Sequence, residues 1–274
     1  MPAVEPSFSE YCNVPVDPSK SPVVALKGVR RTFANGVVAL ERLSLEVWPG
    51  EFVSLLGPSG CGKSTALRII AGLSEPTSGK VEWLDVDAAN APRRIGFVFQ
   101  EPTLMPWATV AANVRLPLKL AGLGASAQAR VDAALARVGL SGFAQSYPRE
   151  LSGGMKMRAS IARALVTEPE LLLMDEPFAA LDEITRFRLN NDLLELWQSL
   201  GKTVVFVTHS VFESVYLSQR IVVMTRRPGR VFTELSIDAP HPRDENFRTS
   251  ADYAGYCRRV SEALACASAA TDEP

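Results

Sequence analysis

Apolar and polar residues alternate along the chain soon after its start. The alternation covers Val23 to Phe33 and Val37 to Trp48, and residues 34–36, Ala-Asn-Gly, form a turn signal between them. A period of two is typical of strands that bury one face, and a short turn favours antiparallel pairing. The pattern therefore predicts two antiparallel strands.

Shorter and more uniformly apolar runs follow at intervals. Runs of about four to eight apolar residues bounded by turn residues are typical of strands buried in a sheet. Further expected strands cover residues 53–56, 81–86, 95–99, 171–174, 204–207, 221–225 and 230–237.

Apolar residues at three- and four-residue spacing separate these runs and predict helices. The expected helices are 65–72, 110–120, 127–138, the segment carrying Met157, Ile161 and Leu165, 184–200, and 244–264. Between Pro102 and Pro148 strand-like alternation is absent, which indicates a helical insertion between two sheet strands. The fold class is therefore α/β.

Composition places the chain among ordinary globular proteins. Of 274 residues, 47% are hydrophobic and 22% charged, and the net charge is −1. This balance gives no electrostatic case for nucleic-acid binding. Residues 1–22, rich in Pro and Ser, lack both the basic start and the apolar core of a secretion signal, so we expect a disordered arm.

Two further features bear on the compartment. Apolar runs stay well short of the ~18 residues that a membrane span needs. The cysteines lack CxxC spacing, which suits a reduced cytosolic protein rather than a zinc site or a disulfide framework; they are Cys12, Cys61, Cys257 and Cys266.

A glycine-rich turn lies between the expected strand 53–56 and the helix after it. It reads GPSGCGKST and comprises Gly57, Pro58, Ser59, Gly60, Cys61, Gly62, Lys63, Ser64 and Thr65. Glycines let backbone N–H groups turn onto phosphate oxygens, and the helix adds its positive N-terminal dipole. Lys63 can reach the β- and γ-phosphates, Ser64 can ligate Mg²⁺, and Cys61 fills the turn. The alternative is a structural turn with an exposed lysine.

Polar side chains follow three buried strands. Asp175 and Glu176 end the run 171–174, and adjacent carboxylates there are costly without a partner. Beside a phosphate loop the natural partner is Mg²⁺, with Asp175 as its outer-shell group and Glu176 as general base for water. Gln100 and His209 follow the strands 95–99 and 204–207, and would share a rim with Asp175 in a parallel sheet. Either one is also compatible with a purely structural role.

Three other segments leave alternatives open. Ser152 suits a helix cap, and Gly153 and Gly154 leave its first N–H groups uncovered, which is weak evidence for a second phosphate site. Phe33 favours a core position on the sequence alone, although an aromatic there can stack on a purine. The apolar cluster of residues 102–107 is either packing or a docking surface.

Taken together, the motifs resemble the ATP-binding subunit of ABC transporters, over residues ~23 to ~240. The matches, in the order of the chain, are the aromatic Phe33, Walker A at 57–64, Gln100, the signature LSGGM at 151–155, Walker B LLLMDE at 171–176, Ala180-Leu181-Asp182, and the switch residue His209. The resemblance implies a P-loop NTPase fold of ABC type. Its parts would be a parallel-sheet core, an antiparallel β edge subdomain and a helical signature subdomain at about 102–165, within a domain of residues 23–240. Residues 241–274 would form a C-terminal helix and tail.

The resemblance also implies ATP and Mg²⁺ as cofactors, with Ser64, Gln100 and Asp175 at the metal. It places Phe33 on adenine, and Asp182 with the signature residues at the nucleotide. Two chains would pair head to tail, so that each ATP lies between one phosphate loop and the partner's Ser152 to Gly154. Met155 departs from the family's glutamine and cannot hydrogen-bond as an amide can.

Met155 looks characteristic of one subgroup of the ABC transporter family. With LMPWATVAANV (104–114), DEPFAALD (175–182) and RRPGRV (226–231) it resembles the nitrate, sulfonate and taurine importers, a subgroup that includes uptake of pyrimidine vitamin precursors. The implied partners are a second ATPase subunit, a permease and, indirectly, a solute-binding protein, at the cytoplasmic face of the inner membrane. The rivals are an exporter subunit and a soluble ABC ATPase acting on DNA or ribosomes; the latter is disfavoured by the short interval between Lys63 and Asp175.

Overall fold

The computed structural model describes residues 21–83, 94–124 and 127–270. They belong to two compact units, one made of residues 1–84 with 207–274 and the other of residues 85–206. Most of the expected N-terminal arm, and the end of the expected strand 81–86, lie outside the described residues. The domain bounds given above stay a prediction.

The first unit contains the predicted antiparallel sheet. Its strands follow the order β2-β1-β4 and are β1 (Val24–Thr32), β2 (Val38–Val47) and β4 (Ser78–Trp83). Val24 stands opposite Val47 on one side and Trp83 on the other, and both pairings are antiparallel. The strand pairing predicted across residues 34–36 is confirmed.

A second set of strands in this unit carries the phosphate loop. It comprises β3 (Phe52–Leu56), β8 (Arg220–Met224) and β9 (Val231–Ser236), in that order. β3 pairs with β8 in parallel, and β8 pairs with β9 antiparallel. All residues of β3 and β8 are buried. Most of them are apolar, and the two polar members have buried partners: Ser54 bonds Ser218, and Arg220 pairs with Glu51.

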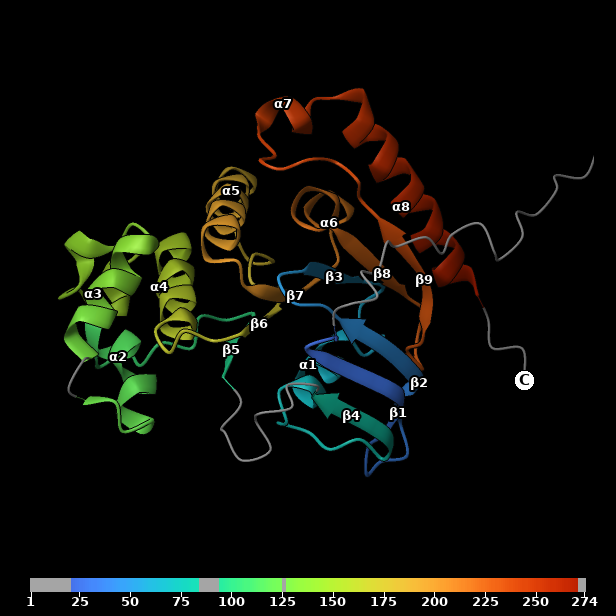
Figure 1. The fold of residues 1–274 in the computed structure, drawn as a ribbon, viewed down its shortest axis with the longest axis horizontal. Helices are drawn as coiled ribbons and strands as arrows, with labels where there is room; N and C mark the ends of the chain where they lie inside the picture. The colour runs from blue at the N-terminus through green and yellow to red at the C-terminus, as the bar shows by residue number, and fades with distance from the viewer. Residues whose placement is uncertain (1–20, 84–93, 125–126, 271–274) are drawn as a thin grey trace, which may run out of the picture. The chain divides into compact units, whose positions relative to one another are not determined.

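Four helices complete the described part of the first unit: α1 (Lys63–Ile70), α6 (Val211–Leu217), α7 (Glu245–Arg248) and α8 (Ala251–Ala269). α1 begins two residues before the predicted start. The single helix predicted over 244–264 is divided, because the Ser250 hydroxyl caps a new helix by accepting from Tyr253 N. α8 then packs along α6 (Figure 1).

The second unit combines a short sheet with a helical group. β5 (Ile95–Val98) pairs in parallel with β6 (Leu171–Asp175), and β7 (Thr203–Thr208) is the next strand after β6. Helices α2 (Val110–Leu120), α3 (Ala127–Arg137) and α4 (Gly153–Leu165) pack on one another, as the green and yellow-green segments of Figure 1 show. Two 3-10 turns, η4 (Ser141–Phe143) and η5 (Pro148–Glu150), and helix α5 (Glu183–Leu200) complete the described unit. The predicted helical insertion is confirmed.

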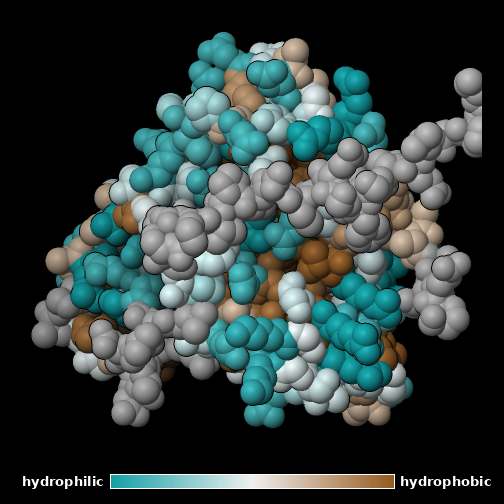
Figure 2. Space-filling model, turned by 45° about the vertical axis from the view of Figure 1, so that its right-hand side comes forward, coloured by the Kyte–Doolittle hydropathy of each residue, from teal (hydrophilic) through white to brown (hydrophobic). Residues whose placement is uncertain are grey.

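The face in Figure 2 is covered mainly by hydrophilic side chains, with hydrophobic ones in smaller patches. Of the helices in the described ranges, none has both the length and the apolar character needed to cross a bilayer.

Candidate functional site

The phosphate loop connects β3 to α1 in the first unit. Gly60 and Gly62 have φ angles of +74° and +108°, which L side chains rarely adopt. A Cβ on Gly62 would also lie 2.6 Å from Leu40 Cδ2 and 2.7 Å from the Ala39 carbonyl oxygen. Glycine at position 62 is therefore required both by the backbone conformation and by the close approach of β2.

Lys63 is folded onto this loop. Its side chain is 96% buried, and Nζ donates to the carbonyl oxygens of Gly57 (2.8 Å) and Pro58 (3.0 Å). The alternative of an exposed lysine on a structural turn is therefore wrong. The ammonium group is held against the loop, where a phosphate would meet it.

The start of α1 suits an anion. Its N-cap is Gly62, so no side chain caps the helix, and its first turn contains no acidic residue. The absence of a side-chain cap together with the helix dipole favours a negative group at this end. Cys61 is buried beneath the loop, in agreement with its predicted role of filling the turn. Ser64 and Thr65 lie half-buried in the first turn.

Gly229 is a support for this loop that sequence reasoning missed. It lies between β8 and β9, where a side chain would collide with the carbonyl oxygen of Cys61. Its N–H donates to Ala39 O (2.9 Å), and its carbonyl accepts from Glu41 N (3.1 Å). The Arg-Pro-Gly signal at 227–229 indicates a turn and gives no hint of this contact.

His209 and Phe33 are the other predicted residues of the first unit. His209 is exposed directly after β7, and its neighbours Thr208 and Ser210 are tied to the first turn of α6. Phe33 is 40% exposed, with the Arg31 guanidinium 5.3 Å from its ring centre. The core position that the sequence alone favours for Phe33 is therefore wrong, because the residue follows the last paired position of β1 and faces solvent.

The predicted carboxylates end β6 in the second unit. Asp175 is buried, with 7% of its surface exposed, and Glu176 is half-buried. Glu176 has φ +45°, in the left-handed region that costs a non-glycine residue roughly 1 kcal/mol or more. Strained backbone of this kind gathers at functional sites, where it aims a side chain.

The start of α4 packs against the start of α5. Ser152 caps α4 by accepting from Met155 N (3.3 Å), as predicted. A Cβ on Gly153 would lie 3.3 Å from Leu181 Cδ2, and one on Gly154 only 2.7 Å from Thr185 Cγ2. The structure thus brings the signature glycines beside the segment that carries Asp182. Asp182 itself caps α5, and the hydrogen bond from Thr185 lowers the pKa of its carboxyl group.

Gln100 is exposed just after β5, and the segment that follows it is tied to α4. Arg163 Nη1 donates to Thr103 O (2.7 Å), and Nη2 donates to Pro102 O (2.9 Å). Sequence reasoning missed Arg163, whose partners are two backbone oxygens, of Pro102 and Thr103, and two hydroxyl groups, of Thr103 and Ser160. Trp107 is 76% exposed, which favours the docking interpretation of residues 102–107 over a packing role for that side chain.

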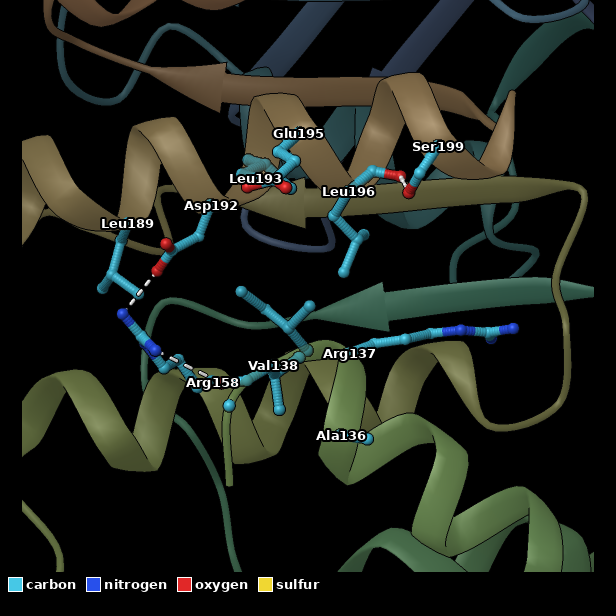
Figure 3. Close-up of a pocket in the computed structure, with 12 residues that line it drawn as sticks. Ala136, Arg137, Val138, Arg158, Leu189, Asp192, Leu193, Glu195, Leu196 and Ser199 are labelled. Carbon is cyan, nitrogen blue, oxygen red and sulfur yellow. Dashed lines mark hydrogen bonds and ion pairs between the residues drawn. The ribbon is translucent and has the colours of Figure 1, made fainter. Parts of the chain in front are cut away.

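A cavity of about 410 Å³ lies among α3, α4 and α5 in the second unit (Figure 3). Arg158 of α4 forms an ion pair there with Asp192 of α5 (2.5 Å) and donates to Val138 O (3.3 Å). The pair fixes the signature helix to α5. The residues lining this cavity do not include the predicted site residues.

Comparison with known proteins identifies the chain. The sequence pattern of the ABC transporter family matches residues 40–179. The chain is 50% identical over 233 residues to an uncharacterised ABC transporter ATP-binding protein of Methanocaldococcus jannaschii, covering 84% of this chain and 85% of that one. It is 44% identical over 222 residues to the aliphatic sulfonates import ATP-binding protein SsuB of Bacillus subtilis, covering 81% and 85%.

Solved structures agree. The dimeric ATP-binding cassette MJ0796, in a post-hydrolysis state bound to ADP and Pi, matches with a TM-score of 0.68 and 38% identity, over 79% of this chain and 100% of that one. The protein cbiO1 of Clostridium perfringens, part of the ABC transporter complex cbiONQ, matches with a TM-score of 0.69 and 26% identity, over 89% and 98%. The predicted ABC ATPase fold is confirmed, and the chain belongs to the ABC transporter family as an ATP-binding subunit that hydrolyses ATP.

Proposed function

We propose that this chain powers the import of a small anionic solute, of the sulfonate type, through a membrane permease. The observation that carries the proposal is the 44% identity to an aliphatic sulfonates import ATP-binding protein over 81% of this chain. The geometry of the phosphate loop supports the proposal that ATP drives this import. The buried Lys63 and the start of α1, which no side chain caps, suit the phosphates of ATP. In this proposal Phe33 stacks on the adenine ring.

Mg²⁺ would accompany the ATP. The residues proposed at the metal are Ser64, Gln100 and, in the outer shell, Asp175. They supply hydroxyl, amide and carboxylate oxygens, the hard donors that Mg²⁺ prefers. The buried Asp175 at the end of β6 fits a carboxylate that faces a cation rather than water. When bound, the metal would neutralise charge on the phosphates.

Glu176 is the proposed general base. It accepts a proton from the water that attacks the γ-phosphate, and its left-handed backbone is strain of the kind that gathers at functional sites. His209 and Lys63 contact the γ-phosphate and stabilise its charge. These roles require the predicted residues to meet around one nucleotide.

The second half of the site comes from a partner copy or a related chain. Ser152, Gly153 and Gly154 would meet the γ-phosphate of the partner's ATP, as in a head-to-tail dimer; the relative bound to ADP and Pi is described as dimeric. Gly153 is exposed, and the Ser152 hydroxyl accepts from Met155 N rather than from Gly153 N. Met155 cannot replace an amide contact, so the sugar would be held by other groups.

The permease would dock at residues 102–107, where Trp107 is exposed and Arg163 ties the segment to the signature helix. The cbiO1 relative is part of a transporter complex, which supports such a partnership. A solute-binding protein would act on the permease from the other side. The proposed location is the cytoplasmic face of the inner membrane.

The catalytic part is tested with Glu176→Gln. This change keeps the shape of the side chain but removes the base, so turnover should fall by ~10²-fold or more, within the range for losing a general base. ATP binding should persist. The measurement is ATPase activity of the chain with its partner subunits, beside nucleotide binding to each variant. Near-normal hydrolysis in Glu176→Gln would refute the assignment.

The solute is tested in cells that lack this chain. Uptake of labelled aliphatic sulfonate, nitrate and a pyrimidine precursor is compared before and after complementation. The proposal expects sulfonate uptake to return with the native chain and not with Glu176→Gln. Recovery of the pyrimidine precursor alone would favour the second subgroup activity, and accelerated loss of preloaded solute would indicate an exporter.

A further inference from the structure

Helix α6 begins two residues after His209 and is held at both ends by other parts of the first unit. We propose that Arg243 and the C-terminal helix α8 are positioning elements for His209, acting through α6. The inference rests on the role proposed above for His209, and it extends the hydrolytic machinery to a segment outside the matched family pattern.

The N-terminal end of α6 fixes the backbone on both sides of His209. Thr208 Oγ1 donates to Glu213 Oε2 (2.5 Å) and accepts from Ser210 N (3.0 Å). Ser210 Oγ in turn accepts from Glu213 N (3.3 Å). Thr208 and Glu213 are both buried. A displacement of the first turn of α6 therefore displaces His209 with it.

The far end of α6 is held by Arg243. Its Nη1 donates to the carbonyl oxygens of Val215 (2.9 Å), Tyr216 (3.0 Å) and Ser218 (2.8 Å). These belong to the last turn of α6 and the residue just after it, where helix carbonyls lack partners within the helix. Only 4% of Arg243 is exposed. A cation at this end also matches the negative pole of the helix dipole.

Arg243 also fixes where that end lies. Nη2 donates to Ile237 O (3.1 Å) and Ala239 O (3.2 Å), on the chain that leaves β9. The Arg243 carbonyl accepts from Tyr216 Oη (2.8 Å). One guanidinium therefore ties the end of α6 to the sheet through the segment after β9.

Helix α8 contacts the N-terminal end of α6. Tyr253 Oη donates to the carbonyl oxygen of Phe212 (3.0 Å), in the first turn of α6, and Tyr253 is 92% buried. α6 has seven residues, five of them buried. A helix this short does not hold its shape alone, because isolated helices below roughly 12 residues are marginal in water. Its position is set by Arg243, Glu213 and Tyr253.

Neither Arg243 nor Tyr253 is a catalytic residue, because each is buried against protein groups. Their loss should let the first turn of α6 move, and a displacement of about 1 Å at a catalytic group can cost up to ~10²-fold in rate. The effect should fall on kcat and leave KM for ATP within about two-fold, since nucleotide binding rests on the phosphate loop.

The test is a double-mutant cycle in the full chain with its partner subunits. Arg243→Leu is expected to lower kcat by about ten-fold or more, and Arg243→Lys, which keeps the charge but reaches fewer carbonyls, by less. In a His209→Ala background, Arg243→Leu should cost less than about two-fold, because its target is already absent. Equal losses in both backgrounds would overturn the inference.

Tyr253→Phe is a milder variant that tests whether a loss of kcat comes from a general folding defect. It removes one hydroxyl and keeps the ring. It should lower kcat by about two- to five-fold, with no added loss beside His209→Ala, a range typical of one hydrogen bond. An unchanged kcat would count against the inference.

A spectroscopic readout separates this inference from the proposed function. The chain contains two histidines, so histidine-labelled protein gives two imidazole signals in NMR, and His209→Ala assigns them. Tyr253→Phe should shift the His209 signal in the free chain. If it does not, the positioning fails whatever the kinetics. If the signal shifts but His209→Ala hydrolyses ATP at the normal rate, the positioning stands and the role proposed for His209 fails.

Discussion

Gly154→Ala tests how closely the signature helix must fit against α5. A Cβ at position 154 would lie 2.7 Å from Thr185 Cγ2, about 1 Å short of a normal contact between carbon atoms. Thr185 cannot easily yield, because its side chain is β-branched and its N–H is bonded to Asp182 (2.9 Å). The start of α4 must therefore shift by roughly 1 Å.

Two opposing terms decide the effect on stability. Overpacking of this kind costs about 1–3 kcal/mol, while alanine in place of glycine in a helix returns up to ~1 kcal/mol. The free energy of unfolding should therefore fall by about 0–3 kcal/mol. Activity should fall more, by up to ~10²-fold, because a shift of about 1 Å moves the groups proposed to meet the partner's γ-phosphate.

The assay is ATP hydrolysis by the chain assembled with its partner subunits, beside thermal unfolding of each variant. Thr185→Ser removes Cγ2 and should restore most of the activity to Gly154→Ala. Gly142→Ala is the matched control, because a Cβ there has no heavy atom within 4 Å. The clash explanation fails if Gly154→Ala hydrolyses ATP within about three-fold of the native rate, or if Thr185→Ser does not rescue it.

Three further predictions concern stability and are checked by urea or thermal unfolding. Arg220→Met should cost about 3–5 kcal/mol, because Arg220 forms a buried ion pair with Glu51 (2.6 Å) and a partly buried one with Glu234 (2.7 Å), and its loss leaves the Glu51 carboxylate buried without a cation; a loss below 1 kcal/mol would contradict this. Gly255→Ala should stabilise the chain by about 0.4–1 kcal/mol, since its added Cβ meets open space within α8; destabilisation would contradict this. Burial and the charge of Arg243 lower the pKa of His241 to about 4 from its usual 6.5, so between these values the unfolded chain binds the proton and the folded chain does not. Stability should therefore fall as pH drops from about 6.5 to 4, by about 1–2 kcal/mol because solvent screens this half-buried ring, and His241→Gln should flatten that part of the profile; unchanged curves would contradict it.

The sequence predicts most of the strands and the longer helices well, but β4 begins at Ser78, three residues before the expected start of the strand 81–86. The helix predicted over 110–120 has the observed bounds, because Thr109 supplies a cap and apolar residues recur at helical spacing. The buried strands follow from mostly apolar runs, although β3 includes Ser54 and β8 begins with Arg220. Helix α6 was missed, since most of its seven residues are buried and it therefore has no polar stripe to reveal its period.

The sequence predicted the candidate site residues, but it did not predict the residues that hold the phosphate loop and the signature helix in place. Lys63 and Ser152 behave as their motifs indicate, because local backbone rules govern a glycine turn and a helix cap. Gly229 and Arg163 escaped notice, since each acts on backbone oxygens far away in the sequence. Phe33 was misjudged on the sequence alone because an aromatic at the end of a strand carries no sign of which side it faces.

The left-handed backbone of Glu176 affects which variants of this chain laboratory selection for heat resistance would favour. At φ +45° a glycine would relieve strain of roughly 1 kcal/mol, and an asparagine part of it. Selection for thermal stability alone should therefore enrich both residues at position 176. Because we propose that Glu176 activates water, such selection would discard hydrolysis as it gained stability. Position 176 is thus the place where screens for stability and for transport should diverge most clearly.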